Sequence, residues 1–248
     1  MSRGADLAGH GGSPSMGVDD YWWYRVRAQL LETVLTPYVG DAESVLDVGS
    51  ADGPSVGWLR GRRTHVTLDI DPRGLRPGEG VNGSALALPF ADESFDVVGA
   101  FDVLEHCEPE GVALDEFARV LRPGGRLLMS VPAYQWAWSD FDEENGHHRR
   151  YTRDRAVLAV QRHGFEVLRV SYAFAGTFPF FAAERLLRRV VRAVRPAPVA
   201  PADVVSLPQT PPVVDRALTG LSGIDRRILR SRDLPFGSSV VLCARKPA

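Results

Sequence analysis

Short apolar runs that alternate with helical patterns are the feature that most constrains the fold of this chain. Four runs have the length and composition of buried strands: residues 44–50 (SVLDVGS), 65–71 (HVTLDID), 95–101 (FDVVGAF) and 125–131 (GRLLMSV). Between the last two, a helical pattern extends from about Pro109 to Leu121. Because buried strands joined through helices form right-handed βαβ units, the pattern predicts an α/β fold with a mostly parallel sheet and helices on both faces.

The second half of the chain adds three further elements. Thr152 is suited to cap a helix that extends to His163, and strand-like runs follow at residues 165–174 and 238–245. In a mostly parallel sheet of this kind, ligands bind beyond the carboxyl ends of the strands. We therefore look for the functional site in the segments that follow the strands.

One domain is expected over residues 18–248, preceded by a disordered Gly- and Ser-rich tail at 1–17. A helical pattern within 18–40 is its first element. Residues 176–237 separate the last two predicted strands and contain two helical patterns joined by a Pro-rich stretch, which is far longer than an ordinary loop. We interpret this segment as a helical lid, because the chain returns after it to complete the sheet.

Composition excludes several functional classes. The formal net charge of −2 provides no field that would attract nucleic acid. The two cysteines, Cys107 and Cys243, are far apart and lack the spacing of a metal site, as in a reduced cytoplasmic protein. No stretch is apolar enough to span a membrane, and the N-terminus lacks the apolar core of a secretory signal. We expect a cytoplasmic protein that does not bind nucleic acid.

The segment LDVGSADGPSVGW follows the first predicted strand and has the character of a ligand-binding loop. Asp47 precedes three small residues, Gly49, Ala51 and Gly53, which permit unusual backbone angles and a close approach of a ligand. Pro54 suits the first turn of a following helix, whose free N–H groups favour an anion. The G-x-G-x-x-G fingerprint of nicotinamide cofactors is absent. A tight turn without a ligand remains the alternative.

An acidic residue at the end of the second predicted strand strengthens the ligand interpretation. Asp69 lies 20 residues after Gly49 (69 − 49), where a carboxylate suits both ribose hydroxyls of a nucleoside. Asp71 precedes Pro72 and fits a helix-capping role better. The two observations together predict a nucleoside-containing cofactor.

Four segments in the same order carry a resemblance to a known family: VLDVGSADG, LDID, GSALALPFADESFDVVGAFDVLEH and RVLRPGGRLLMSVP. They resemble a class I S-adenosylmethionine-dependent methyltransferase of the broad type 11 group, over about residues 44–132. The resemblance implies S-adenosyl-L-methionine as cofactor. It also implies a Rossmann-like, doubly wound sheet of seven strands, mostly parallel, whose last strand is antiparallel.

The resemblance also implies a set of cofactor-binding residues. Gly49, Ala51 and Gly53 would hold the methionine part, Asp69 the ribose, and Ser84 and Ala85 the adenine; Phe101 and Asp102 would line the site, and Trp23 and Arg27 would fold over it. The complete set is Trp23, Arg27, Asp47, Gly49, Ser50, Ala51, Gly53, Asp69, Ile70, Ser84, Ala85, Phe101 and Asp102. Arg27 would pair with the methionine carboxylate. Two residues depart from the family pattern: Ala51 replaces a glycine, and the uncharged Ser84 stands where an aspartate is common.

The flanking segments YWWYRVR, VPAYQWAWSDFDEENGHHRRYTRD, FPFFAAERLLRR and LPFGSSVVLCARKP are similar to a bacterial subgroup of these methyltransferases. The expected acceptor is a small-molecule or lipid-linked metabolite. Core packing of Trp22 and Trp23 on the sheet is an equally strong interpretation of the tryptophans in the first segment.

Histidines are the expected catalytic residues. Methyl transfer from a sulfonium mainly requires alignment of the acceptor, but a hydroxyl acceptor also needs a base that works near neutral pH. His106, His147 and His148 all follow predicted strands at the cofactor edge. Packing or helix capping is the alternative for His106. The residues expected to contact the acceptor are Tyr134, Trp138, Arg149, Arg150 and Tyr151.

A metal site in the acidic run is not expected. Asp140, Asp142, Glu143 and Glu144 lie next to His147 and His148, but the cluster is contiguous, whereas metal-dependent methyltransferases draw their ligands from separate strand ends. Arg149 and Arg150 would repel a cation. They favour an anionic substrate group or salt bridges to the acidic run, and a salt bridge is the favoured interpretation for at least one of them.

The helix predicted within residues 178–195 is basic and amphipathic. Such a helix is suited to a membrane surface, although packing on the domain or in a homodimer is the commoner explanation. Peripheral membrane contact would favour a lipid-linked acceptor.

Three rival functions remain open: a nicotinamide-dependent oxidoreductase on a similar sheet, a non-catalytic methyltransferase-like scaffold, and a methyltransferase that acts on nitrogen or carbon without a base.

Overall fold

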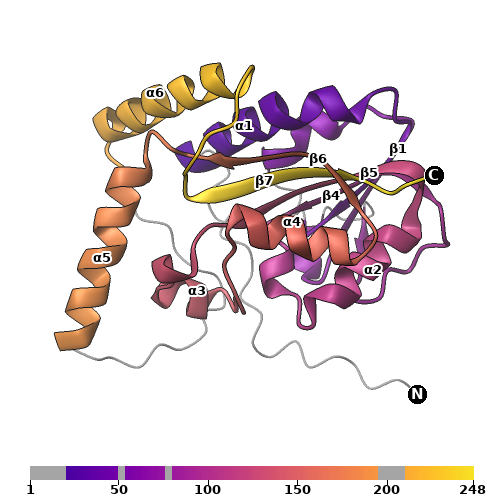
Figure 1. Ribbon diagram of the computed structural model, residues 1–248, viewed down its shortest axis with the longest axis horizontal. Helices are drawn as coiled ribbons and strands as arrows, with labels where there is room; N and C mark the ends of the chain where they lie inside the picture. The colour runs from indigo at the N-terminus through magenta and orange to yellow at the C-terminus, as the bar shows by residue number, and fades with distance from the viewer. Residues whose placement is uncertain (1–20, 50–53, 76–79, 195–209) are drawn as a thin grey trace.

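The computed structural model describes residues 21–49, 54–75, 80–194 and 210–248, which form one seven-stranded sheet in the order β3-β2-β1-β4-β5-β7-β6 (Figure 1). The strands are β1 (Ser44–Val48), β2 (Thr64–Asp69), β3 (Val81–Asn82), β4 (Phe95–Phe101), β5 (Leu121–Pro132), β6 (Glu166–Ala173) and β7 (Ser239–Arg245). Neighbours among β1 to β5 pair in parallel, and β7 is antiparallel to both β5 and β6. The expected seven-stranded sheet with an antiparallel last strand is therefore confirmed.

Helices cover both faces of the sheet. α1 (Trp22–Val39) and α6 (Pro212–Leu229) lie on one face, and α2 (Glu110–Val120) and α4 (Arg153–Arg162) on the other (Figure 1). As expected, Thr152 caps α4, because its hydroxyl accepts a hydrogen bond from Arg155 N at 3.2 Å. The helix expected at Pro54 is a 3-10 helix, η2 (Pro54–Leu59).

Short elements follow several of the strands. They are η3 (Pro72–Gly74), η4 (Leu104–His106), η5 (Gln135–Ala137) and α3 (Asp140–Glu144). The core lies between the central strands and the helices: every residue of β1 is buried, and Leu46, Val97 and Leu127 are fully inaccessible to solvent. The near-continuous apolar character of the central strands follows from this burial on both faces.

A carboxylate joins three strands at the end of the sheet where the parallel strands begin. Asp96 Oδ2 accepts hydrogen bonds from Glu43 N at 3.0 Å, Ser44 N at 2.9 Å and Ser44 Oγ at 2.8 Å, and Arg122 lies 2.6 Å from Oδ1. Partial burial raises the pKa of the Asp96 carboxyl, but the hydrogen bonds from Arg122, Ser44 and Glu43 outweigh it and lower the pKa to about 2. This residue ties the start of β1 to β4 and β5.

The segment interpreted as a lid contains α5 (Phe178–Val194) and α6. α6 packs along α1, where Arg25 and Asp215 form an ion pair at 2.8 Å. α5 has no buried residue, and its apolar side chains Leu187, Val190 and Val194 are all more than half exposed. Among the described residues, no helix combines the length and the hydrophobicity that crossing a membrane requires.

We predict that Asp96→Asn removes part of the acid sensitivity of the fold. A carboxyl whose pKa falls from about 4 in the unfolded chain to about 2 in the native protein contributes roughly 2 kcal/mol at neutral pH, and partial exposure reduces this to about 1. That contribution is complete above about pH 4 and disappears as the pH falls through about 2. The free energy of unfolding in urea should therefore differ less between pH 7 and pH 3 for Asp96→Asn than for the wild-type chain.

The matched control is Asp92→Asn. The Asp92 side chain is 74% exposed and pairs with Arg119 on the surface, so its loss should leave the pH dependence unchanged. Equal pH dependence of the wild-type and Asp96→Asn proteins would contradict the role of Asp96.

Candidate functional site

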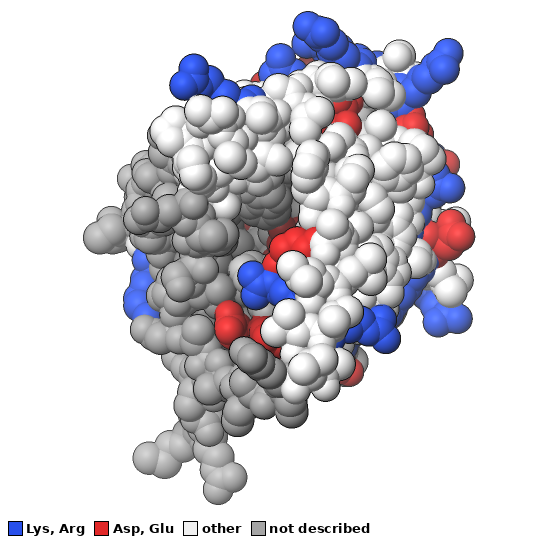
Figure 2. All heavy atoms as spheres, turned by 90° about the vertical axis from the view of Figure 1, so that its left-hand side faces the viewer, with Lys and Arg blue, Asp and Glu red and all other residues white. Residues whose placement is uncertain are grey.

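The carboxyl ends of the parallel strands meet at one edge, which faces the viewer in Figure 2 and is hollowed at its centre. Gly49 follows β1 with a φ of +67°, a left-handed conformation that favours glycine. A Cβ atom on Gly49 would lie 2.5 Å from Val103 Cγ2, so no larger residue fits there without movement. The glycine is required by the tight turn and by the close approach of the segment that follows β4.

The expected ribose-binding residue lies at the end of β2. Asp69 is buried, and its Oδ1 accepts a hydrogen bond from Asp71 N at 2.9 Å. Asn82, at the end of β3, donates to the carbonyls of Asp69 at 3.0 Å and Ile70 at 2.9 Å. Asp71 accepts a hydrogen bond from Arg73 N and caps η3, which confirms the role expected for it. The backbone around Asp69 is thus fixed on both sides.

Asp102 connects β4, β5 and α1. It has a φ of +58°, accepts a hydrogen bond from Ser130 Oγ at 3.0 Å, and pairs with Arg27 at 2.9 Å. The Arg27 guanidinium also lies 5.1 Å from the centre of the Trp23 ring, which stacks on Phe174. α1 is thereby attached to the carboxyl edge by an ion pair and by aromatic packing. Sequence reasoning placed Arg27 and Asp102 at the cofactor but did not foresee that they pair.

The remaining residues expected at the cofactor differ in exposure. Asp47 and Phe101 are buried, Ser84 and Ala85 are half-buried, and Ile70 is 37% exposed. Ser84 Oγ accepts a hydrogen bond from Leu86 N at 3.2 Å. Ser50, Ala51 and Gly53 lie outside the described residues. The described residues expected at the cofactor thus come from three places: α1, the ends of β1, β2 and β4, and the segment before β4.

A buried carboxylate positions His147. Asp142 is fully buried; its Oδ1 lies 2.9 Å from His147 Nδ1, and Arg150 binds both carboxylate oxygens, at 2.7 and 3.0 Å. Burial raises the pKa of the Asp142 carboxyl, but His147 and Arg150 outweigh it and lower the pKa to about 2. The carboxylate is therefore ionised, and it fixes the orientation of the imidazole as an orienting group does in hydrolase triads.

The segment after β4 meets the His147 segment. Glu105, in η4, is fully buried, and its backbone carbonyl accepts a hydrogen bond from His148 N at 2.8 Å. Among the described residues, neither carboxylate oxygen of Glu105 has a hydrogen-bond partner. Burial and the charge of Asp102 raise the pKa of the Glu105 carboxyl well above its usual range. The rings of His106 and His147 lie 4.6 Å apart, whereas the side chain of His148 is exposed.

Glu105 is a functional candidate that sequence reasoning missed. The signal was present, because an acid stands between Leu104 and His106 in an otherwise apolar segment after a buried strand. His147 lies 42 residues away along the chain (147 − 105), and only the fold brings the two residues close to one another.

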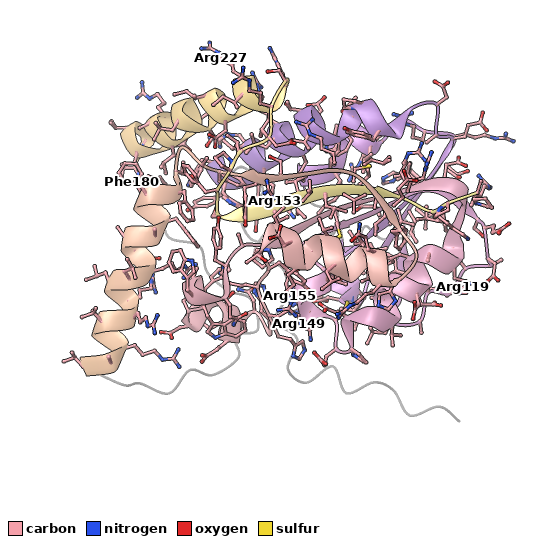
Figure 3. All side chains as sticks on the ribbon, viewed as in Figure 1. Arg119, Arg149, Arg153, Arg155, Phe180 and Arg227 are labelled. Carbon is pink, nitrogen blue, oxygen red and sulfur yellow. The ribbon has the colours of Figure 1, made fainter. Side chains whose placement is uncertain are left out.

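The two arginines that sequence analysis considered as an anion clamp are bound to carboxylates of the chain. Arg149 donates to Cys107 O at 2.7 Å and pairs with Glu108 and Glu110, at the turn that leads into α4 (Figure 3). Arg150 pairs with Asp142, which is the salt bridge to the acidic run that the sequence favours for one arginine. Both guanidinium groups are thus engaged within the protein, which differs from the expected contact with an acceptor.

Tyr151 also differs from its expected role. It is fully buried, and its hydroxyl donates a hydrogen bond to the Glu110 carboxylate. Burial and that carboxylate raise the pKa of the phenol far above its ordinary value. A side chain enclosed in this way packs in the core, in contact with Glu110 and without access to solvent.

The aromatic segment after β5 borders a groove. Tyr134 stacks on Tyr172, and Trp136 and Trp138 line a groove of about 730 Å³ together with Arg188 and Arg189 of α5. Trp138 Nε1 donates to Glu143 at 3.3 Å. The groove is broad enough for a small ligand and lies between α5 and the acidic helix α3.

Comparison with known proteins identifies the central part of the chain. Residues 46–129 match the family described as "Methyltransferase domain". A probable phthiotriol/phenolphthiotriol dimycocerosates methyltransferase from Mycobacterium ulcerans is 40% identical over 33% of this chain and 36% of its own length. A demethylmenaquinone methyltransferase from Mycobacterium tuberculosis is 34% identical over 46% of this chain and 49% of its own length. The matches thus span between a third and a half of these relatives.

Solved structures share the fold of this chain over almost its whole length. The [4+2]-cyclase SpnF has a TM-score of 0.59 at 20% identity, over 97% of this chain and 87% of its own. The N-methyltransferase NodS from Bradyrhizobium japonicum, solved with S-adenosyl-L-homocysteine, has a TM-score of 0.52 at 14% identity, over 94% and 95% of the two chains. At these identities the likeness establishes the fold, and SpnF shows that one fold hosts different reactions.

We predict that Asp142→Asn is strongly destabilising. The change leaves the buried Arg150 guanidinium, whose side chain is 4% exposed, without its counter-charge. Removal of one partner of a buried ion pair costs about 3–5 kcal/mol. The free energy of unfolding in urea at pH 7 measures the loss.

Asp140→Asn is the matched control in the same helix. Asp140 pairs with Arg192 at 2.6 Å, but both side chains are more than a third exposed, so the expected loss is below about 1 kcal/mol. Similar losses for the two variants would show that the buried Arg150 guanidinium does not need the Asp142 counter-charge.

Proposed function

We propose that this chain, which belongs to the class I S-adenosylmethionine-dependent methyltransferases, transfers a methyl group to a hydroxyl oxygen of a small-molecule or lipid-linked metabolite with the assistance of histidine. The observation that carries the proposal is that the candidate cofactor residues and the His147 cluster lie at the same edge of the sheet. Gly49 and Asp69 are positioned for a nucleoside cofactor, and the backbone bond from His148 to Glu105 holds the oriented His147 next to the end of β4.

The residues at the carboxyl edge fit S-adenosylmethionine. Gly49 leaves the space that a Cβ would fill, and Asp69 provides a buried carboxylate of the kind that binds ribose hydroxyls. Ser84 and Ala85 precede β4 at the same edge and are proposed for the adenine. Arg27, which faces Asp102, is proposed for the methionine carboxylate, because a guanidinium binds carboxylates in a fork. When bound, the cofactor supplies an activated methyl group on a sulfonium.

The chain's own residues would position and activate the acceptor. A hydroxyl oxygen attacks a sulfonium methyl more readily once its proton is withdrawn, and imidazoles are suited to assist this near neutral pH. His147 has the fixed orientation that such a role requires, since Asp142 holds its Nδ1. Tyr134 and Trp138, on the segment after β5, are proposed as the apolar wall for the acceptor, since Trp138 lines the groove and Tyr134 stacks on Trp136, which also lines it.

A lipid-linked acceptor has two lines of support. Relatives that match the central domain are named for the methylation of phthiotriol dimycocerosates and of demethylmenaquinone. α5 exposes Leu187, Val190 and Val194 together with Arg188 and Arg189, a composition suited to the surface of an anionic membrane. Phe180, labelled in Figure 3, is also 64% exposed on α5. The alternative is that a second copy of the chain covers the exposed apolar side chains of this helix.

We predict that the purified chain binds S-adenosylmethionine and that Asp69→Asn weakens the binding. Loss of a charged acceptor for the ribose hydroxyls costs about 1.5–3 kcal/mol, or roughly 10- to 100-fold in Kd. Isothermal titration calorimetry measures both proteins. Asp71→Asn, which alters the cap of η3 and the ion pair with Arg73 but keeps the backbone hydrogen bond to Asp69, serves as the control with unchanged Kd. Absence of binding to a folded wild-type chain, or binding of NAD in its place, would refute the cofactor assignment.

We predict that His147→Ala lowers kcat at least about 100-fold with little change in the Kd of S-adenosylmethionine, because the imidazole acts on the acceptor and not on the cofactor. His148→Ala should lower kcat as well, but by a smaller factor, because the His148 side chain is exposed. A substrate screen that follows S-adenosylhomocysteine release identifies the acceptor and measures the rates. His163→Ala is the control, since His163 pairs with Asp115 at the end of α4 and outside the His147 cluster. An unchanged kcat in His147→Ala would exclude histidine assistance.

A further inference from the structure

We infer that Glu105, His106 and His147 form a binding site for a divalent first-row transition metal ion. One ligand atom from each residue lies within 4.8 Å of the others. Metal–ligand bonds of about 2.0–2.2 Å place neighbouring ligand atoms roughly 3–3.5 Å apart, so modest side-chain rotations would bring the three atoms onto one ion. The ligands come from η4 and from the segment after α3, not from the contiguous acidic run that sequence analysis considered and rejected.

Glu105 is the observation that points most directly to a cation. Its side chain is completely buried, and among the described residues neither carboxylate oxygen accepts a hydrogen bond. Buried carboxylates in proteins are paired, hydrogen-bonded or bound to metal ions. A divalent ion between Glu105 and the two imidazoles would satisfy two carboxylate oxygens that have no hydrogen-bond partner within the described part of the chain.

A carboxylate holds the His147 ring from behind, as is common for histidines that bind metal ions. Asp142 holds its Nδ1 at 2.9 Å, which leaves Nε2 as the nitrogen that would bind the ion. Metal-bound histidines almost always contact a carboxylate, carbonyl or water through their second nitrogen, which fixes the ring and raises its basicity. Arg150 in turn fixes Asp142 through both oxygens, so the orientation of the ring is determined before any ion binds.

The neighbouring arginines do not oppose a cation in the folded protein. Arg150 is neutralised by Asp142, Arg149 pairs with Glu108 and Glu110, and Arg27 pairs with Asp102. Each of these three arginines therefore has a carboxylate partner, so none of them adds an uncompensated positive charge beside the cluster. The repulsion expected from the sequence alone is cancelled by contacts that only the fold creates.

The ligand set selects the class of metal. Two imidazoles and one carboxylate suit Zn²⁺, Fe²⁺, Co²⁺ and their neighbours, whereas Mg²⁺ and Ca²⁺ prefer oxygen ligands. Three protein ligands leave coordination positions open, as in catalytic sites.

The role of the ion in the reaction rests on the proposed methyl transfer. An open position would take the acceptor hydroxyl, whose pKa the ion lowers so that its proton passes to water. The C–S bond of the sulfonium then breaks as the C–O bond forms, and the cofactor leaves as a neutral thioether. His147 would in this case assist the reaction by holding the ion.

Titration of the metal-stripped full chain with Co²⁺, followed by visible absorption, tests the site without measuring activity. We expect one equivalent of Co²⁺ to give d–d bands typical of nitrogen and oxygen ligands, which Zn²⁺ removes by competition. Glu105→Gln and His106→Gln should each weaken Co²⁺ binding at least about 10-fold, whereas His163→Ala should bind as the wild-type chain does. Absence of the bands in the wild-type chain, or their full retention in both variants, would overturn the inference.

Two further measurements separate folding and cofactor binding from metal binding. Circular dichroism verifies the fold of each variant, and His106→Gln, at a half-buried position, provides a second test if Glu105→Gln does not fold. Calorimetry with S-adenosylmethionine on the same wild-type sample distinguishes the two proposals. Cofactor binding without Co²⁺ binding would overturn the metal site and leave the proposed function, and Co²⁺ binding without cofactor binding would do the reverse.

Discussion

Parallel pairing of β1, β2 and β4 brings the ends of these strands to one edge, and the strand-end candidates for the cofactor depend on that arrangement. A parallel strand requires a crossover, so the chain must leave this edge after each strand and return at the opposite one. The segments that leave the sheet can carry ligand-binding residues, because strand pairing constrains their length but not their sequence. Gly49, Asp69 and Asp102 each occupy the first positions of such a segment or the last of a strand.

The second half of the site depends on charges placed inside the protein. Asp142 is buried among Arg150 and His147, and the array costs desolvation that only complete hydrogen bonding offsets. Such an array is better suited to specify one side-chain geometry than to add stability. It fixes an imidazole within contact of His106 and beside the buried Glu105, which is the precision that an acceptor site requires.

The fold could be predicted from the sequence because each strand and helix is indicated by a short continuous stretch of residues. Buried strands such as residues 44–48 are continuous apolar runs, and the cap at Thr152 is a single recognisable residue. β3 was not found because two residues carry no periodicity. The partners of Arg149 and Arg150 and the proximity of Glu105 to His147 could not be predicted, since each depends on contacts between distant segments. The ends of the strands indicated where a ligand is expected, but not which charges neutralise one another there.

The antiparallel placement of β7 between β5 and β6 has an evolutionary consequence. β6 and β7 are hydrogen-bonded neighbours, so the chain leaves the sheet after β6 and re-enters it beside the same strand. The segment between them begins and ends at adjacent points, and the entropy of closing such a loop grows only slowly with its length. Residues can therefore be gained, lost or exchanged there while the strand register and the cofactor edge stay as they are. Relatives that share the central domain are free to differ in this segment, and a change of acceptor need not disturb the cofactor.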